Sequence, residues 1–186
     1  VTIVLSDGTE ISGKDVKVIY SHPLADLALI KINKTGLKAI KWGDSDKLRV
    51  GERVAAIGSP LDLKATITQG IICAKNRDID VMSHLIQTDA VINPGSSGGA
   101  LVNLDGELIG VNRLITSNTG RWQGFGFAIP SNDAKWFTDE VIKNGEIQLG
   151  YLGVRMYDDG PEKMRILATS GMEPDAEGVL IQSLPY

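Results

Sequence analysis

Residues 93–101 read Asn93-Pro94-Gly95-Ser96-Ser97-Gly98-Gly99-Ala100-Leu101, a glycine-rich turn that leads directly into an apolar run. Gly95 can adopt backbone angles that are closed to other residues, so the turn can present a hydroxyl group at its tip. An acyl-transfer site needs such a hydroxyl together with backbone N–H groups that point at the developing oxyanion. The stretch therefore predicts Ser97 as a nucleophile and the N–H groups of Gly95 and Ser97 as an oxyanion hole. The alternative interpretation is a surface turn rich in glycine and serine.

The sequence on both sides of this turn narrows the choice. Strand-like apolar runs precede and follow it, at residues 86–92 and 100–103. The neighbouring motifs are Gln87-Thr88-Asp89-Ala90, Gly106-Glu107-Leu108-Ile109-Gly110-Val111-Asn112 and Gly126-Phe127-Ala128-Ile129-Pro130-Ser131. In this order and spacing they resemble the HtrA/Deg family of trypsin-like serine proteases, and the resemblance covers nearly the whole chain. Ser96 departs from the family pattern, which usually has Asn before the nucleophile.

Composition and charge exclude several classes of function. The 186 residues are 42% apolar and 23% charged, as in an ordinary globular protein, and the net charge is −4. No basic cluster indicates nucleic-acid binding, and no apolar run approaches the roughly 20 residues of a membrane-spanning helix. Cys73 is the only cysteine, so an internal disulfide is impossible and the thiol is expected to be a small buried group. We predict neither a metal site nor a cofactor.

The distribution of apolar residues predicts an all-β fold. Short apolar runs alternate with turn-forming residues, and no helical period occurs before residue 131. The resemblance implies a trypsin-like double β-barrel, with the first barrel incomplete and the second beginning near residue 47. The predicted strands span residues 1–5, 10–19, 24–32, 53–60 and 66–72, with a hairpin turn at Asp7-Gly8 and a polar loop at 76–80.

A helical period appears only after residue 130. Ala134, Phe137 and Val141 recur on one face of the predicted helix. Ser131 is a suitable N-cap, and Gly145 is placed to end the helix in a left-handed conformation. We expect this single helix to close the β-domain by packing against the second barrel.

Asp26 interrupts an apolar run at residues 24–32. An unpaired buried carboxylate is costly, so Asp26 needs hydrogen bonds or access to water. It can lie at the wet end of its strand, or it can orient a histidine in a catalytic triad. The sequence Asp26-Leu27-Ala28 resembles the triad-aspartate motif of the HtrA/Deg family, and this resemblance favours the second role.

The sequence has two histidines, and neither suits the role of general base in this fold. His22 lies only four residues before Asp26, and His84 follows it, whereas trypsin-like chain order places the base well upstream of the aspartate. The resemblance implies that the base lies on a segment before Val1. Since the chain starts within a strand pattern, we expect a fragment without its N-terminal segment, in which case any leader or anchor is also missing.

The resemblance also implies the walls of the primary specificity pocket. In trypsin-like proteases the residue six before the nucleophile forms the base of this pocket, and an Asp there selects Arg or Lys. That residue is Val91, with Ile92 beside it, and further walls are expected from Val111, Asn112 and residues 124–126. Such a pocket predicts a preference for small aliphatic side chains.

Residues 148–186 follow the predicted protease domain at 1–147 and start a new strand pattern. The motif Tyr151-Leu152-Gly153-Val154 resembles the opening of a PDZ domain, in which loop N–H groups bind the terminal carboxylate of a peptide. Residues 178–183 resemble a later PDZ strand, and the chain ends short of a complete domain. An ordinary β-extension is the alternative.

The resemblance implies a serine endopeptidase that degrades unfolded or damaged polypeptides in protein quality control. It also implies binding of peptide C-termini, a homotrimer or larger oligomer, and an extracytoplasmic location such as the periplasm. The alternative function is that of a catalytically inactive holdase or peptide-binding adaptor. An α/β-hydrolase does not fit, because a strand pattern and not a helix follows Ser97.

Overall fold

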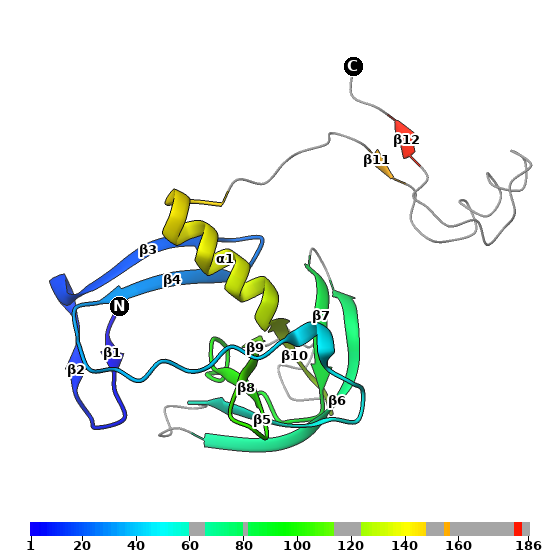
Figure 1. The fold of residues 1–186 in the computed structure, drawn as a ribbon, viewed down its shortest axis with the longest axis horizontal. Helices are drawn as coiled ribbons and strands as arrows, with labels where there is room; N and C mark the ends of the chain where they lie inside the picture. Colours follow the sequence, from blue (N-terminus) through cyan, green and yellow to red (C-terminus); the bar gives the residue numbers. More distant parts are fainter. Residues whose placement is uncertain (60–65, 80–81, 114–123, 148–154, 157–180, 184–186) are drawn as a thin grey trace, which may run out of the picture. The chain divides into compact units, whose positions relative to one another are not determined.

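The computed structural model describes residues 1–59, 66–79, 82–113, 124–147, 155–156 and 181–183 of the chain. The chain separates into two compact units, Val1–Ile147 and Gln148–Tyr186. In the first unit, the described residues form β-strands, two short 3-10 helices and one α-helix (Figure 1). The prediction of an all-β fold with a single helix is therefore confirmed.

Six strands of the first unit close into an antiparallel barrel in the order β10-β7-β6-β5-β8-β9 (Figure 1). Closure pairs both edges of the sheet and brings the connection between β7 and β8 beside β9. That connection carries the glycine-rich turn at residues 93–99. The strands are β5 (Arg53–Gly58), β6 (Thr66–Ile79), β7 (Met82–Thr88), β8 (Ala100–Asn103), β9 (Leu108–Arg113) and β10 (Gly126–Pro130).

The barrel differs from the sequence prediction in the length of β6. The polar loop predicted at 76–80 is wrong, because β6 continues through Ile79. Asn76 has a positive φ of 54°, and the register between β6 and β7 shifts on both sides of Arg77. Such irregularities let a strand continue through polar residues while it bends.

Two hairpins precede the barrel in the chain. In the first, β1 (Ile3–Val4) pairs with β2 (Glu10–Ile11) across the predicted Asp7-Gly8 turn. In the second, β3 (Val16–His22) pairs with β4 (Leu27–Ile32). Both pairs are antiparallel, and each forms a two-stranded sheet in the part of the chain that the structure describes.

The hairpins correct two strand predictions. The strand predicted at 10–19 is interrupted by a 3-10 helix, η1 (Gly13–Asp15), where Gly13 has a φ of +62°. Local backbone geometry therefore ends the first hairpin before the second begins. The strand predicted around Asp26 starts after it, at Leu27, so Asp26 lies in the turn between β3 and β4.

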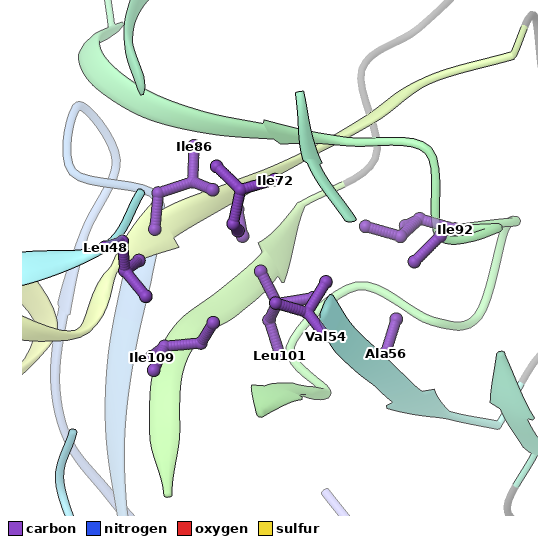
Figure 2. Packing of buried hydrophobic residues seen from close by; sticks show 10 residues of the cluster. Leu48, Val54, Ala56, Ile72, Ile86, Ile92, Leu101 and Ile109 are labelled. Atoms are coloured by element: carbon purple, nitrogen blue, oxygen red, sulfur yellow. The ribbon is translucent and has the colours of Figure 1, made fainter. Parts of the chain in front are cut away.

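The interior of the barrel is filled by aliphatic side chains from all around the sheet (Figure 2). On β5, Val54 and Ala56 are buried, whereas Arg53, the first residue of the strand, is exposed. This alternation is the two-residue period of a β-strand. Removal of this apolar surface from water stabilises the barrel that carries the glycine-rich turn. The core cluster consists of Leu48, Val54, Ala56, Ile72, Ile86, Ala90, Ile92, Leu101, Ile109 and Ala128.

The helix α1 (Ser131–Asn144) packs against both the barrel and the second hairpin. Its predicted apolar face is confirmed, because Ala134, Phe137 and Val141 are buried, and Gly145 ends it with a left-handed φ of +82°. The helix contacts β9 and β10 of the barrel, as predicted, and also β4. Its apolar face forms a cluster with side chains of the second hairpin and its turn: Ile19, Tyr20, Ala25, Leu27 and Leu29.

The start of α1 differs from the prediction. Ser131 does not cap the helix; it is the first helical residue, and its buried hydroxyl donates to the carbonyl oxygen of Gly43 at 2.9 Å. The N–H of Asn132 donates to the hydroxyl oxygen of Ser45 at 3.2 Å. Ser45 begins the 3-10 helix η2 (Ser45–Lys47), in the connection before the barrel. A distant segment therefore satisfies a helix N–H that the sequence assigned to a local cap.

In the second unit the structure describes β11 (Arg155–Met156), paired antiparallel with β12 (Ile181–Ser183). Residues 151–154, predicted as a carboxylate-binding loop, lie outside the described residues. Among the residues with a described structure, no helix combines the length and apolar character needed to span a membrane.

Candidate active site

The turn between β7 and β8 places its two serines in opposite environments. Ser96 is 5% exposed, whereas Ser97 is exposed at the surface. The N–H of Ser96 donates to the carbonyl oxygen of Asn93 at 2.8 Å, and the N–H of Gly99 donates to the carbonyl oxygen of Ser96 at 3.0 Å. These bonds hold the turn so that it presents Ser97, the predicted nucleophile.

The glycines of this turn are required for two different reasons. Gly95 and Gly98 have φ angles of +96° and +81°, in the region that other residues rarely adopt. At Gly99 the reason is space, because a Cβ atom there would lie 2.0 Å from the carbonyl oxygen of Ile57 on β5. The turn therefore lies directly against the barrel wall. The predicted oxyanion donors, the N–H groups of Gly95 and Ser97, belong to it.

Asn112 on β9 holds the turn from the other side. Its side-chain Nδ2 donates to the carbonyl oxygens of Ile57 and Ala100, both at 3.1 Å. Its backbone accepts from the N–H of Gly98 and donates to the carbonyl oxygen of Gly99, both at 2.8 Å. Asn112 was predicted as a pocket wall, and its hydrogen bonds make it a structural link between the nucleophile turn and two barrel strands.

A cavity of about 490 Å³ brings the predicted nucleophile and the predicted triad aspartate together. Ser97 and Gly98 lie on its barrel side with Val111 and Asn112, and Asp26 lies on the side of the second hairpin. Of the predicted site residues, the structure thus gathers Asp26, Ser97, Val111 and Asn112 around one space. The other lining residues are Leu27, Ala28, Ile30, Trp42, Arg113, Ile129, Ala134, Phe137 and Thr138.

Asp26 lies at the turn of the second hairpin with a positive φ of 51°. Its Oδ2 accepts a hydrogen bond from Nε of Arg113 at 2.8 Å. Sequence reasoning missed Arg113, although an arginine at the end of a largely buried strand is a signal for an ion pair. Asp26 thus lies in the turn just before β4, with an arginine as its polar partner, and its role in orienting a histidine stays a prediction.

Neither histidine lines the cavity that Ser97 and Asp26 share. Nδ1 of His22 accepts a hydrogen bond from the N–H of Ala25 at 3.1 Å, within the hairpin turn. His84 lies on a separate cavity of about 280 Å³, near Asp133, where burial raises the pKa of the Asp133 carboxyl. The structure therefore offers no imidazole of its own, in the part that it describes, for proton transfer at Ser97.

Val91 and Ile92, predicted at the base of the specificity pocket, are not among the described residues that line this cavity. The carbonyl oxygen of Val91 accepts a hydrogen bond from the Thr68 hydroxyl at 2.9 Å. Ile92 is buried in the barrel core, and its Cδ1 would lie 2.8 Å from a Cβ atom on Gly126. The Ile92 side chain thus fills the space beside one of the other predicted pocket residues.

Comparison with known proteins adds to this geometry. Residues 1–111 match the trypsin-like peptidase domain. The chain belongs to the trypsin-like peptidase family. The match covers the two hairpins and most of the barrel strands, from β1 to the middle of β9.

Individual relatives confirm the predicted resemblance to the HtrA/Deg proteases. The chain is 41% identical over 186 residues to a probable periplasmic serine endoprotease, DegP-like, of Brucella suis, which covers 98% of this chain and 35% of the relative. It is 47% identical to the periplasmic serine endoprotease DegP of Salmonella typhimurium, over 83% of this chain and 33% of that protein. The solved structure of the HtrA-type protease AlgW with tripeptide covers 100% of this chain and 60% of its own, with a TM-score of 0.87 and 38% identity. The trypsin-like peptidase chain thus spans about a third of the length of these curated relatives.

Proposed function

We propose that this trypsin-like peptidase chain is the catalytic part of a serine endopeptidase of the HtrA/Deg type. The observation that carries the proposal is the shared cavity, which both the exposed Ser97 and Asp26 line. Ser97 is placed at the tip of a turn that the barrel supports on two sides. The relatives named as serine endoproteases support the same function.

The proposed mechanism assigns one role to each group. Oγ of Ser97 attacks the scissile carbonyl carbon, and the N–H groups of Gly95 and Ser97 stabilise the negative charge that develops on the carbonyl oxygen. A histidine accepts the Ser97 proton and returns it to the leaving amine, while Asp26 orients that histidine. Because neither imidazole of the chain lines the cavity, this base is supplied from outside residues 1–186.

The substrates and setting are proposed from the relatives. We propose unfolded or damaged polypeptides as substrates, since an endopeptidase cleft of this kind binds extended backbone. We propose an extracytoplasmic, periplasmic location, because these relatives are periplasmic serine endoproteases by name. Residues 148–186 are proposed to begin a PDZ domain that binds peptide C-termini, with a homotrimer or larger oligomer as the working assembly. Crosslinking and mass measurement of the full-length protein test the assembly.

The proposal is tested by two neighbouring substitutions in the full-length protein. Ser97→Ala removes the nucleophile and should abolish cleavage of unfolded casein, while the circular dichroism spectrum stays unchanged. Ser96→Ala is the matched control, because Ser96 is buried and is not among the described residues that line the cavity, and it should keep most activity. If Ser96→Ala is the inactive variant, the turn has been interpreted in the wrong register.

A second candidate function is a catalytically inactive holdase or peptide-binding adaptor. The observation in its favour is the absence of an imidazole among the described residues around the cavity. Reading the residues encoded before Val1 separates the two functions. A histidine in an Asn-His-Val-like context supports the protease, and any other residue at that position supports the adaptor.

A further inference from the structure

We infer that Arg113 is a positioning residue that holds the Asp26 carboxylate toward the cavity lined by Ser97. The inference rests on the proposed function, because it needs Asp26 to orient the histidine base. It concerns a contact between parts of the chain that are 87 residues apart, the turn of the second hairpin and the end of β9. No sequence motif of the resemblance includes Arg113.

The geometry of the pair carries the first step. Nε of Arg113 donates to Oδ2 of Asp26 at 2.8 Å, and the two side chains are 18% and 56% exposed. Arg113 is therefore largely buried, and its Nη1 is buried without a hydrogen-bond partner among the described residues. A guanidinium in this environment needs its carboxylate partner, since a largely buried charge without one is strongly destabilising. Packing around Arg113 in turn fixes the direction from which it reaches Asp26.

The backbone and the carboxylate of Asp26 are positioned by different contacts. Leu27 packs both against Leu85, Phe127 and Ile129 of the barrel and against the helix cluster of Phe137. This packing places the backbone of the hairpin turn. More than half of the Asp26 side chain is exposed, so packing alone leaves the carboxylate free to rotate. The hydrogen bond from Arg113 removes that freedom.

Strand β9 contacts both the nucleophile turn and Asp26. Asn112 holds the nucleophile turn through its backbone and side chain, and the next residue, Arg113, holds the aspartate. Adjacent residues of one strand have a nearly invariant separation, so β9 sets the distance between the two groups. Asp26 and Arg113 are also the only charged residues among those described around the cavity.

This arrangement has an electrostatic consequence for the base. A guanidinium bonded to Asp26 opposes the additional positive charge of an imidazolium on the same carboxylate. Its removal should therefore favour protonation of the histidine and move the acidic limb of the kcat/KM profile to higher pH. Loss of a merely structural contact does not move this limb.

The test uses the full-length protease with Arg113→Met, which removes the charge and keeps much of the volume, and Arg113→Lys, which keeps the charge without Nε. Arg113→Met should lower kcat by up to about 100-fold, as expected for a misplaced catalytic group, with KM nearly unchanged and the acidic limb at higher pH. Arg113→Lys should restore the limb and only part of kcat. Lys135→Met, an exposed ion-pair partner on α1, is the charge control and should match the wild type.

Two results overturn the inference. The first is an Arg113→Met protein with the kcat of the wild type. The second is a fall in kcat, corrected for the folded fraction, while the acidic limb of the kcat/KM profile stays at the same pH. Ser97→Ala, measured in parallel, separates this inference from the proposed function. An active Ser97→Ala protein overturns the protease function itself. An inactive Ser97→Ala protein beside an unaffected Arg113→Met protein overturns only the role of Arg113.

Discussion

At the scale of single residues, the structure assigns opposite tasks to neighbours in the nucleophile turn. Ser96 packs against Gly58 on β5, where a Cβ atom would lie 2.7 Å from the Ser96 Cα, and Ser97 faces outward. The close contact between Ser96 and Gly58 leaves no room for a side chain at Gly58. The position of Ser97 thus depends on contacts made by residues that have no part in the chemistry.

Asn112 is the residue whose loss should loosen this turn most directly. Asn112→Ala leaves the carbonyl oxygens of Ile57 and Ala100 without their side-chain donor, and unsatisfied buried groups cost roughly 1–3 kcal/mol each. We expect a fall in the free energy of unfolding of that order, measured by denaturant titration, and a lower kcat in the full-length protein. Asn144→Ala, which removes an exposed amide bonded to Glu140, is the control and should change stability by less. Equal effects of the two variants would contradict the role given to Asn112.

We also expect substrate specificity to depend on single side chains. Val91 and Ile92 place no carboxylate at the predicted base of the pocket, so the cost of desolvating Arg or Lys is not offset there. We expect cleavage mainly after small aliphatic residues, as a preference, because one methylene group is worth only ~1–3 kcal/mol. Mass spectrometry of denatured protein digested by the full-length enzyme gives the cleavage sites. Dominance of Lys or Arg on the acyl side would show that Val91 does not line the pocket.

At the scale of elements, helix α1 stabilises the hairpin that carries Asp26. Phe137 is 3% exposed and lies in the cluster with Leu27 and Leu29. Phe137→Ala should lower the free energy of unfolding by roughly 3–5 kcal/mol, as expected for a buried aromatic ring. Ile142→Ala on the same helix is the matched control, since Ile142 is 71% exposed and should change stability little. Similar melting temperatures for the two variants would show that the helix face has been misassigned.

The junction of η2 with α1 should make part of the stability depend on pH. The Lys47 ammonium group, followed by the Asn132 amide, lowers the pKa of Asp44 from 3.8 to about 2. A carboxyl with a lowered folded-state pKa contributes stability above its unfolded value, and this contribution is lost as the pH falls through the folded value. Asp44→Asn should therefore flatten the decrease in unfolding free energy between about pH 4 and pH 2, measured by urea titration at each pH. An unchanged slope would contradict the lowered pKa.

At the scale of the whole molecule, the site combines groups from the second hairpin and from the barrel. Because neither histidine of the chain lines this site, we expect the 186-residue chain by itself to cleave peptides very slowly. Without the base, only a residual of roughly 10³–10⁴-fold over water remains from the oxyanion hole and substrate binding. A reporter-peptide assay on the purified chain, with the full-length protein as reference, measures this. Comparable turnover by the two proteins would contradict the proposed source of the base.

The sequence by itself determined the features that depend on local chemistry. The glycine-rich turn with Ser97, the Asp7-Gly8 hairpin and the left-handed end of α1 at Gly145 were all predictable. In each case a few consecutive residues favour one backbone conformation, whatever surrounds them. The apolar strand runs likewise required a β-fold, because only a packed core can remove their surface from water.

The tertiary structure decided the features that depend on a partner far along the chain. The Ser131 hydroxyl bonds to Gly43, 88 residues away, where the sequence indicated a local cap. The contact of Asp26 with Arg113 spans 87 residues, and no local pattern specifies it. Polar side chains bond to whichever donor or acceptor the fold brings within about 3 Å, and buried ones must find one. The closure of the barrel and the packing of α1 on the hairpin determine which distant donors and acceptors lie within hydrogen-bond distance of each other.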